Sequence, residues 1–131
     1  MRFPKNDGII TSLDTVGWTS WTPTYSSGVG APTTVTLASA KYKIYGDNLF
    51  WFWRGTLTLV GTASADFRIT VPSGLGPLNT TSGYGIRNET ANIGLQVVVI
   101  TTHIVLMTVG NAFPLPTNGD VGSAFGNYKV A

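Results

Sequence analysis

The chain has 131 residues and a low charge content of 11%, with eight Lys and Arg residues against six Asp and Glu residues. The length suits one domain with a hydrophobic core. The basic residues are too few and too scattered to form the continuous positive surface that binds a nucleic-acid backbone. The lack of cysteine excludes disulfide scaffolds and thiolate metal sites, and no apolar run is long enough for a membrane-spanning helix.

The N-terminal residues 1–17 show no alternation of apolar and polar side chains. We expect them to form an arm or linker before a single β-sandwich domain over residues 18–131. They also lack the long apolar segment of a secretory signal.

Trp18 and Trp21 follow this segment, outside any clear predicted strand. Two tryptophans left in water would be unusual, so we expect them to pack over the end of the sandwich or on a neighbouring subunit. The alternative is that they stack on a sugar or anchor a partner.

Strand-forming residues dominate the rest of the chain, and no segment combines helical periodicity with capping signals. Residues 33–39 and 41–45 are predicted strands, and a turn at 46–48 leads into an aromatic strand over 49–60. The two lysines of the second strand fall on its outward face. In the first two strands we expect four side chains to face inward: Val35, Leu37, Tyr42 and Ile44.

The aromatic strand is unusual because both of its faces begin with large apolar side chains. One face is expected to line the core: Leu49, Trp51, Trp53, Gly55, Leu57 and Leu59. The other face begins with Phe50 and Phe52. A second sheet of the same domain covers only one face of a strand, so we expect another subunit to cover these two phenylalanines. Burying both would contribute roughly 3–6 kcal/mol.

The second half of the chain continues the β pattern. The predicted strands cover residues 66–71, 84–89, 93–101, 103–109 and 125–130. The strands at 93–101 and 103–109 have apolar residues on both faces, so we expect them to be buried on both sides.

Two irregular segments, residues 73–83 and 111–123, are candidate ligand-contact loops. The residues expected to contact a ligand are Asn79, Tyr84, Asn111 and Asn118. The residues expected to form a subunit interface are Phe50, Phe52, Val98, Ile100, Trp18 and Trp21.

No catalytic constellation is visible. His103 is the only histidine, and a lone histidine is usually a surface or hydrogen-bonded residue; three copies around a trimer axis could hold a metal or anion only with further ligands. No Gly-x-Ser-x-Gly elbow occurs, and the acidic residues are interpreted as surface charges instead of a paired-carboxylate site. We therefore predict no catalytic, cofactor or metal site.

Several stretches in one order resemble a known family. They are Trp18-Thr19-Ser20-Trp21-Thr22-Pro23-Thr24, Ala40–Phe52 and Phe67–Gly74. This order resembles the terminal β-sandwich modules of tailed-bacteriophage tail fibres and related virion proteins, over residues 18–74. The resemblance implies a jelly-roll-like antiparallel β-sandwich that forms a homotrimer on the virion surface. It also implies contacts with other virion proteins and with a host-surface glycan or protein, without enzymatic activity.

The resemblance leaves more than one role open. The first expectation is a tail-fibre-type receptor-binding or structural module. The alternative is a capsid decoration protein that stabilises the phage head, because tail fibres normally carry a long shaft before this module and only seventeen residues precede it here. A glycan-processing enzyme is a third hypothesis, which the acidic residues do not support. No cofactor, nucleic-acid partner or membrane partner is expected.

Overall fold

The computed structural model describes residues 17–130 except 83, 92, 109 and 111, and for residues 81–82 and 84–87 it describes the backbone alone. The predicted arm, apart from Gly17, and the predicted contact Asn111 therefore lie outside the described residues. The strands are β1 Thr19–Ser20, β2 Tyr25–Val29, β3 Thr34–Tyr45, β4 Asn48–Leu59, β5 Ser64–Thr70, β6 Thr81–Ser82, β7 Tyr84–Asn88, β8 Leu95–Val99, β9 His103–Thr108 and β10 Asp120–Lys129.

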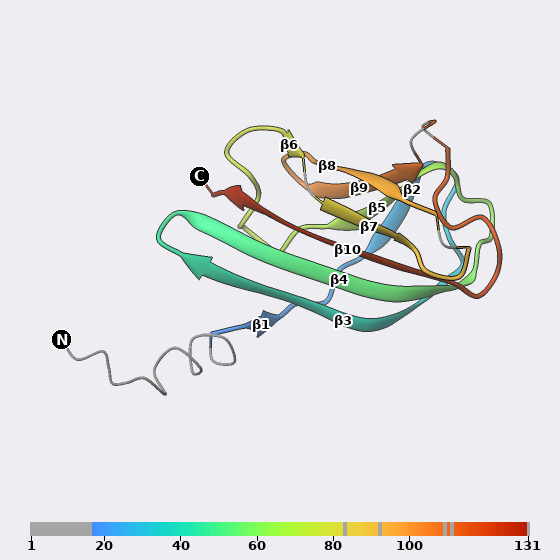
Figure 1. Cartoon of the computed structure of the whole chain (residues 1–131), viewed down its shortest axis with the longest axis horizontal. Helices are drawn as coiled ribbons and strands as arrows, with labels where there is room; N and C mark the ends of the chain where they lie inside the picture. The colour runs from blue at the N-terminus through green and yellow to red at the C-terminus, as the bar shows by residue number, and fades with distance from the viewer. Residues whose placement is uncertain (1–16, 83, 92, 109, 111, 131) are drawn as a thin grey trace.

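These strands form two antiparallel sheets that lie face to face (Figure 1). Sheet A has the order β1-β3-β4-β10-β7, and sheet B has the order β2-β5-β9-β8-β6. The described part of the chain contains no helix. The predicted all-β class, with two antiparallel sheets packed as a sandwich, is confirmed.

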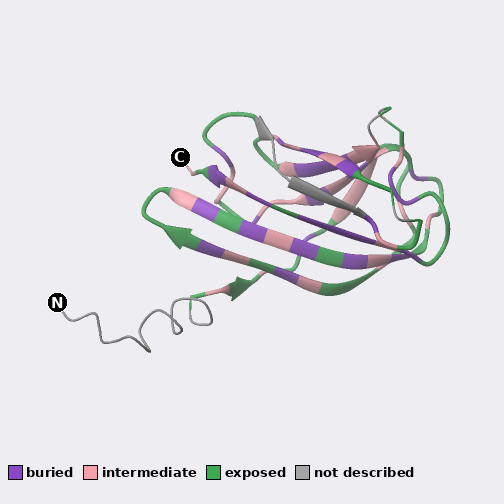
Figure 2. Cartoon of the chain, in the orientation of Figure 1, coloured by how far each residue is buried: buried purple, intermediate pink, exposed green. Residues whose placement is uncertain are grey.

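The core lies between the sheets and is built around the predicted inner face of the aromatic strand. Leu49, Trp51, Trp53 and Leu57 are each at most 1% exposed, and Figure 2 shows the resulting alternation along β4. The Trp53 ring meets Phe67 of sheet B with 5.7 Å between ring centroids. The period-two prediction for this strand is therefore confirmed over most of its length.

Two glycines make room for the Trp53 indole. Gly55 of β4 and Gly122 of β10 are cross-strand partners. A Cβ atom on Gly55 would lie 2.6 Å from Cζ2 of Trp53, and one on Gly122 would lie 3.1 Å from the methyl carbons of Leu115. The absence of side chains at this pair leaves the space that the Trp53 indole and the Leu115 side chain occupy.

Three apolar residues that the pattern placed in the core are exposed instead: Leu37 is 37%, Ile44 is 42% and Leu59 is 43% exposed. β3 and β4 have 12 residues each, whereas the strands of sheet B have at most 7. Sheet B therefore leaves the ends of the β3–β4 hairpin uncovered. A register shift between Leu37 and Ser39 also disturbs the alternation in β3.

The last strand is longer than predicted, because it begins at Asp120 and not near Phe125. Asp120, interpreted from the sequence as a surface charge, is only 4% exposed. Its Oδ2 atom accepts hydrogen bonds from Asn88 Nδ2 at 3.1 Å and from the backbone N–H of Thr117 at 2.9 Å. The carboxylate thus fixes the turn that leads into β10 and is not a surface charge.

β8 and β9 are buried more on one face than on the other. The apolar core-facing residues of these strands are at most 8% exposed: Leu95, Val97, Val99, Ile104 and Leu106. On the outer face Val105 is 6% exposed, whereas Val98 is half-buried. Burial on both sides is therefore confirmed only in part.

Candidate functional site

The outer face of sheet A carries the aromatic residues that the core does not use. Two rows of cross-strand neighbours lie there across β3, β4 and β10: Lys43–Phe50–Asn127 and Lys41–Phe52–Phe125. Neighbouring strands are about 4.8 Å apart, so each row spans about 10 Å. Phe50 is 38% and Phe125 is 45% exposed. We call these six residues the aromatic face.

The chain itself covers part of the aromatic face. Trp18 packs on Phe52 with 5.4 Å between ring centroids, and Tyr45 packs on Phe50 at 6.0 Å. Phe52 is half-buried as a result, without another subunit. Because Phe50 and Phe125 stay exposed, the cover is incomplete.

Lys43 lies beneath this cover. Its side chain is on the outer face, as the alternation predicts, but the residue is only 6% exposed. Its Nζ atom lies 5.8 Å from the ring centroid of Trp18 and 5.0 Å from that of Tyr45. Aromatic faces attract a cation, which offsets part of the cost of burying this ammonium group.

The lysines of the aromatic face have no counter-ion in the described part of the chain. The ion pairs there join Arg54 to Glu89, Arg68 to Asp66 and Lys129 to Asp47. Hydrogen bonds and charge from Glu89 hold the pKa of Arg54 above its usual value, and Asp66 does the same for Arg68. Lys41, which is exposed, and Lys43 join neither these pairs nor another described carboxylate.

Trp21 lies away from the aromatic face, at the edge of the core. Its indole Nε1 donates a hydrogen bond of 2.9 Å to the carbonyl oxygen of Thr70, and its ring lies 6.2 Å from that of Tyr42. Trp21 thus connects the start of the chain to both sheets, which agrees with the expectation that it packs on the sandwich.

Val98 and Ile100 lie on the opposite side of the molecule. Val98 pairs with Val105 across β8 and β9 and alternates with the core residues Val97 and Val99, so it faces outward from sheet B. Ile100 follows β8 and is half-buried. The residues predicted for one subunit interface therefore do not lie together: Trp18, Phe50 and Phe52 are at the aromatic face, Val98 and Ile100 are on the side of sheet B, and Trp21 is at the edge of the core.

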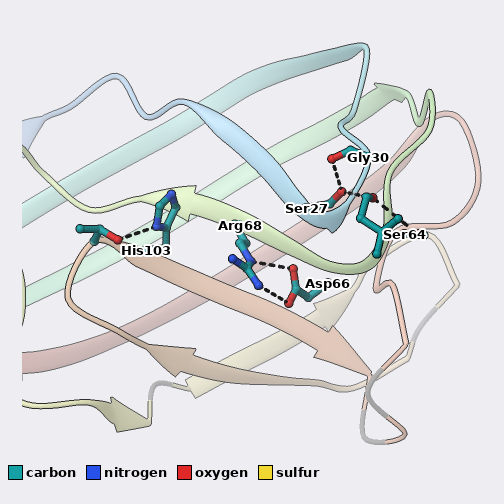
Figure 3. Close-up of polar contacts among 8 residues, drawn as sticks. Ser27, Gly30, Ser64, Asp66, Arg68 and His103 are labelled. Carbon is teal, nitrogen blue, oxygen red and sulfur yellow. Dashed lines mark hydrogen bonds and ion pairs between the residues drawn. The ribbon is translucent and has the colours of Figure 1, made fainter.

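The outer face of sheet B also carries polar pairs (Figure 3). Arg68 donates two hydrogen bonds to Asp66, at 2.9 Å and 3.2 Å. His103 Nδ1 lies 2.7 Å from the hydroxyl oxygen of Thr102, in line with the predicted hydrogen-bonded histidine. Among the described residues, no group of three or more His, Cys, Asp or Glu side chains could hold a metal ion.

The two candidate ligand loops lie at opposite ends of β10. The Leu78 N–H donates to the carbonyl of Lys129 at 2.8 Å, at the end of this strand, and the neighbouring Asn79 is exposed and lines a cavity of about 240 Å³. Asn118 precedes the strand, and its Oδ1 atom accepts a hydrogen bond of 2.9 Å from the Val60 N–H. The structure therefore does not bring Asn79 and Asn118 together.

Tyr84 is the remaining predicted ligand contact, and its backbone lies next to the aromatic face. Its backbone on β7 pairs with Phe125 of β10. Sequence analysis missed Phe125 as well as the two lysines as members of one face. The alternation of Phe125 and Asn127 with Gly126 and Tyr128 could have indicated the outer side of β10, but not which strand lies next to it.

A second cavity, of about 420 Å³, lies at one end of the sandwich between residues 71–77 and the β8–β9 turn. Ser73, Thr101 and Thr102 supply its hydroxyl groups, and none of its lining residues is charged. The described part of the chain has no helix long and apolar enough to span a membrane.

Compared with known proteins, the chain matches no family model, no curated protein and no solved structure.

Proposed function

We propose that this protein is a non-enzymatic surface protein of a tailed-phage virion, and that it acts as a tail-fibre-type attachment module. The resemblance of residues 18–74 to the terminal modules of tail fibres supports this role, and a sandwich of two antiparallel sheets is compatible with it. Such a module presents a rigid scaffold whose outer surfaces contact other molecules.

The observation that carries the proposal is the aromatic face. The core is complete without it, yet Phe50 and Phe125 remain 38% and 45% exposed on adjacent strands. Aromatic residues gathered on one exposed surface are typical of a face that binds a partner. Catalysis would instead need convergent acid, base or nucleophilic groups, and the aromatic face offers none.

The homotrimer is part of the proposal, and we place its contacts on the outer face of sheet B. Val98 and Ile100 supply apolar surface there, and the neighbouring charges of Arg68 and Asp66 pair with each other. The aromatic face is a poorer contact between copies because its lysines have no counter-ion among the described residues. This revises the sequence-based expectation, which assigned Phe50 and Phe52 to the interface.

The jelly-roll-like topology belongs to the same proposal. The chain passes between the sheets from β1 to β2, from β2 to β3, from β4 to β5, from β6 to β7, from β7 to β8 and from β9 to β10. In contrast, the β3–β4 and β8–β9 connections are hairpins within one sheet. The repeated crossings between sheets favour a jelly-roll-like description, and the two hairpins distinguish this chain from a simple alternation.

Immunogold labelling of purified virions tests the location. Label at the tail is the expected result. Label over the head would contradict attachment and would favour a capsid decoration protein that stabilises the head. Particles without label would contradict a virion-surface location altogether.

Competition for adsorption tests attachment itself. An excess of the soluble protein is expected to protect host cells from the phage, because the copies occupy the host receptor. The Phe125→Asp variant is expected to protect less, whereas Val29→Asp, which changes an exposed apolar residue outside the aromatic face and outside the two candidate loops, is expected to protect as well as wild type. Equal protection by all three proteins would argue against the aromatic face as the attachment surface.

A further inference from the structure

The aromatic face combines groups that suit a flat, polar, negatively charged ligand. Phe50 and Phe52 occupy its centre, Phe125 lies at its β10 edge and two lysines lie at its β3 edge. The amide of Asn127 lies at the end of one row, where it can both donate and accept hydrogen bonds. The rows are about 10 Å long, which is the dimension of one or two sugar rings.

The charges of the described residues are distributed unevenly. Every described carboxylate already has a partner: Asp47 pairs with Lys129, Asp66 with Arg68 and Glu89 with Arg54, while Asp120 is buried and hydrogen-bonded. Lys41 and Lys43 are left without one, and both lie on the aromatic face. The face thus has a net positive charge that the described part of the molecule does not neutralise.

Resting on the proposed attachment function, we propose that the aromatic face binds a carboxylated saccharide of the hexuronic-acid kind. The apolar C–H face of the sugar ring packs on Phe50 and Phe125, and its carboxylate accepts hydrogen bonds from the Lys41 ammonium group. Charge-assisted hydrogen bonds of this kind are stronger than neutral ones. Lys43, held between Trp18 and Tyr45, adds positive potential beneath the same edge.

Two other occupants fit this face less well. Among its described residues, a second copy of the chain would bring only carboxylates that are already paired or buried, and none of these would be available to the two lysines. A nucleic acid needs a row of cations that follows its phosphates, and the aromatic face has only Lys41 and Lys43 at one edge.

Isothermal titration calorimetry of the full chain with trigalacturonic acid tests the proposal, with the neutral galactose trisaccharide as the matched ligand. Wild type is expected to bind the acidic sugar at least about tenfold more tightly than the neutral one. Lys41→Gln is expected to lose about that factor, and Phe125→Ala is expected to weaken binding of both sugars. Lys129→Gln, which removes an exposed cation outside the face, is expected to bind like wild type.

Absence of binding, equal affinity for the two sugars, or unchanged affinity in Lys41→Gln would each overturn the proposal. Light scattering on the same samples identifies the competing occupant: a lower mass for Phe125→Ala than for wild type would assign the face to copies of the chain, and would also overturn it. Virion labelling and adsorption competition do not depend on this sugar. The attachment function can therefore stand where the saccharide proposal fails.

Discussion

Trp53 lies over a pair of glycines that face each other across β4 and β10, and this pair decides how closely the indole approaches the sheet. Gly55 and Gly122 are cross-strand partners, and the position of a Cβ atom on Gly55 is only 2.6 Å from the indole ring. Real Cβ atoms do not approach other atoms so closely. An added methyl group must therefore displace a ring that is 1% exposed and packed against Phe67.

We expect Gly55→Ala to lower the free energy of unfolding by about 1–3 kcal/mol, as overpacking of a filled core does. Urea unfolding followed by tryptophan fluorescence measures this change. Gly94→Ala is the matched control, because a Cβ atom there meets nothing within 4 Å. Equal stability of the two variants would show that the Trp53 ring can move without cost.

Two tyrosines should make the free energy of unfolding depend on pH in the alkaline range. Burial raises the pKa of Tyr128 above its usual range, and burial raises the pKa of Tyr25 against a smaller opposing effect of its hydrogen bond with Trp53. In the unfolded chain a tyrosine ionises near pH 10. The unfolded state therefore loses these protons first as the pH rises, and the contribution of the buried tyrosines to stability is lost above about pH 10.

The free energy of unfolding should consequently be steady up to about pH 9 and should fall above about pH 10. Urea unfolding across this range measures the decline. Tyr128→Phe should be less stable at neutral pH, since it loses the hydrogen bond of 2.6 Å to the Leu75 carbonyl, but its decline at alkaline pH should be shallower. An identical decline in the variant would mean that Tyr128 does not contribute to it.

At the scale of elements, alternation predicted the inner face of β4 and of β5 because period two follows directly from strand geometry. Leu49, Trp51, Phe67 and Ile69 are all fully buried or nearly so. Alternation could not reveal how far the opposite sheet extends. Leu59 continues the apolar pattern and is exposed only because sheet B has shorter strands.

The candidate site was predictable only in its central strand. Phe50 and Phe52 follow from the sequence of β4, whereas their neighbours follow from pairing between segments far apart in the chain. Lys43 and Asn127 flank Phe50 because of the registers in which β3 and β10 pair with β4. Register depends on the whole fold, so the local pattern could indicate the outward side of each strand but not which residues lie opposite one another.

The segment before β10 was expected to be an irregular surface loop, yet it inserts Leu115 into the core, where it is fully buried. We expect Leu115→Ala to lower the free energy of unfolding by about 2–5 kcal/mol, because the change leaves a cavity beside Gly122. Chemical denaturation gives the value. Leu78→Ala, at a residue 53% exposed, should change it by no more than about 0.5 kcal/mol; similar losses for both would contradict this role.

At the scale of the whole molecule, the two outer faces of the sandwich are proposed to have different tasks. In this proposal the outer face of sheet B contacts other copies, and the aromatic face binds a ligand. The oligomeric mass can separate these assignments, since a charge buried at a subunit contact without a partner is strongly unfavourable.

We expect Val98→Asp to shift the mass measured by light scattering from trimer toward monomer, and Phe52→Asp to leave the mass of the folded protein unchanged. Circular dichroism verifies that both variants remain folded. The reverse result, with only Phe52→Asp dissociating, would return the subunit contact to the aromatic face. Wild-type protein that is monomeric at all concentrations would contradict the trimer.

β10 bonds to β4 on one side and to β7 on the other, although it follows both of them in the chain. During synthesis, the backbone groups on one edge of β4 therefore stay unpaired until β10, the last of the described strands, has left the ribosome. An aromatic strand with an open edge readily pairs with other nascent chains. The yield of this protein in cells should accordingly depend on chaperones that shield β4 during translation, even though the finished sandwich keeps that strand fully enclosed between its neighbours.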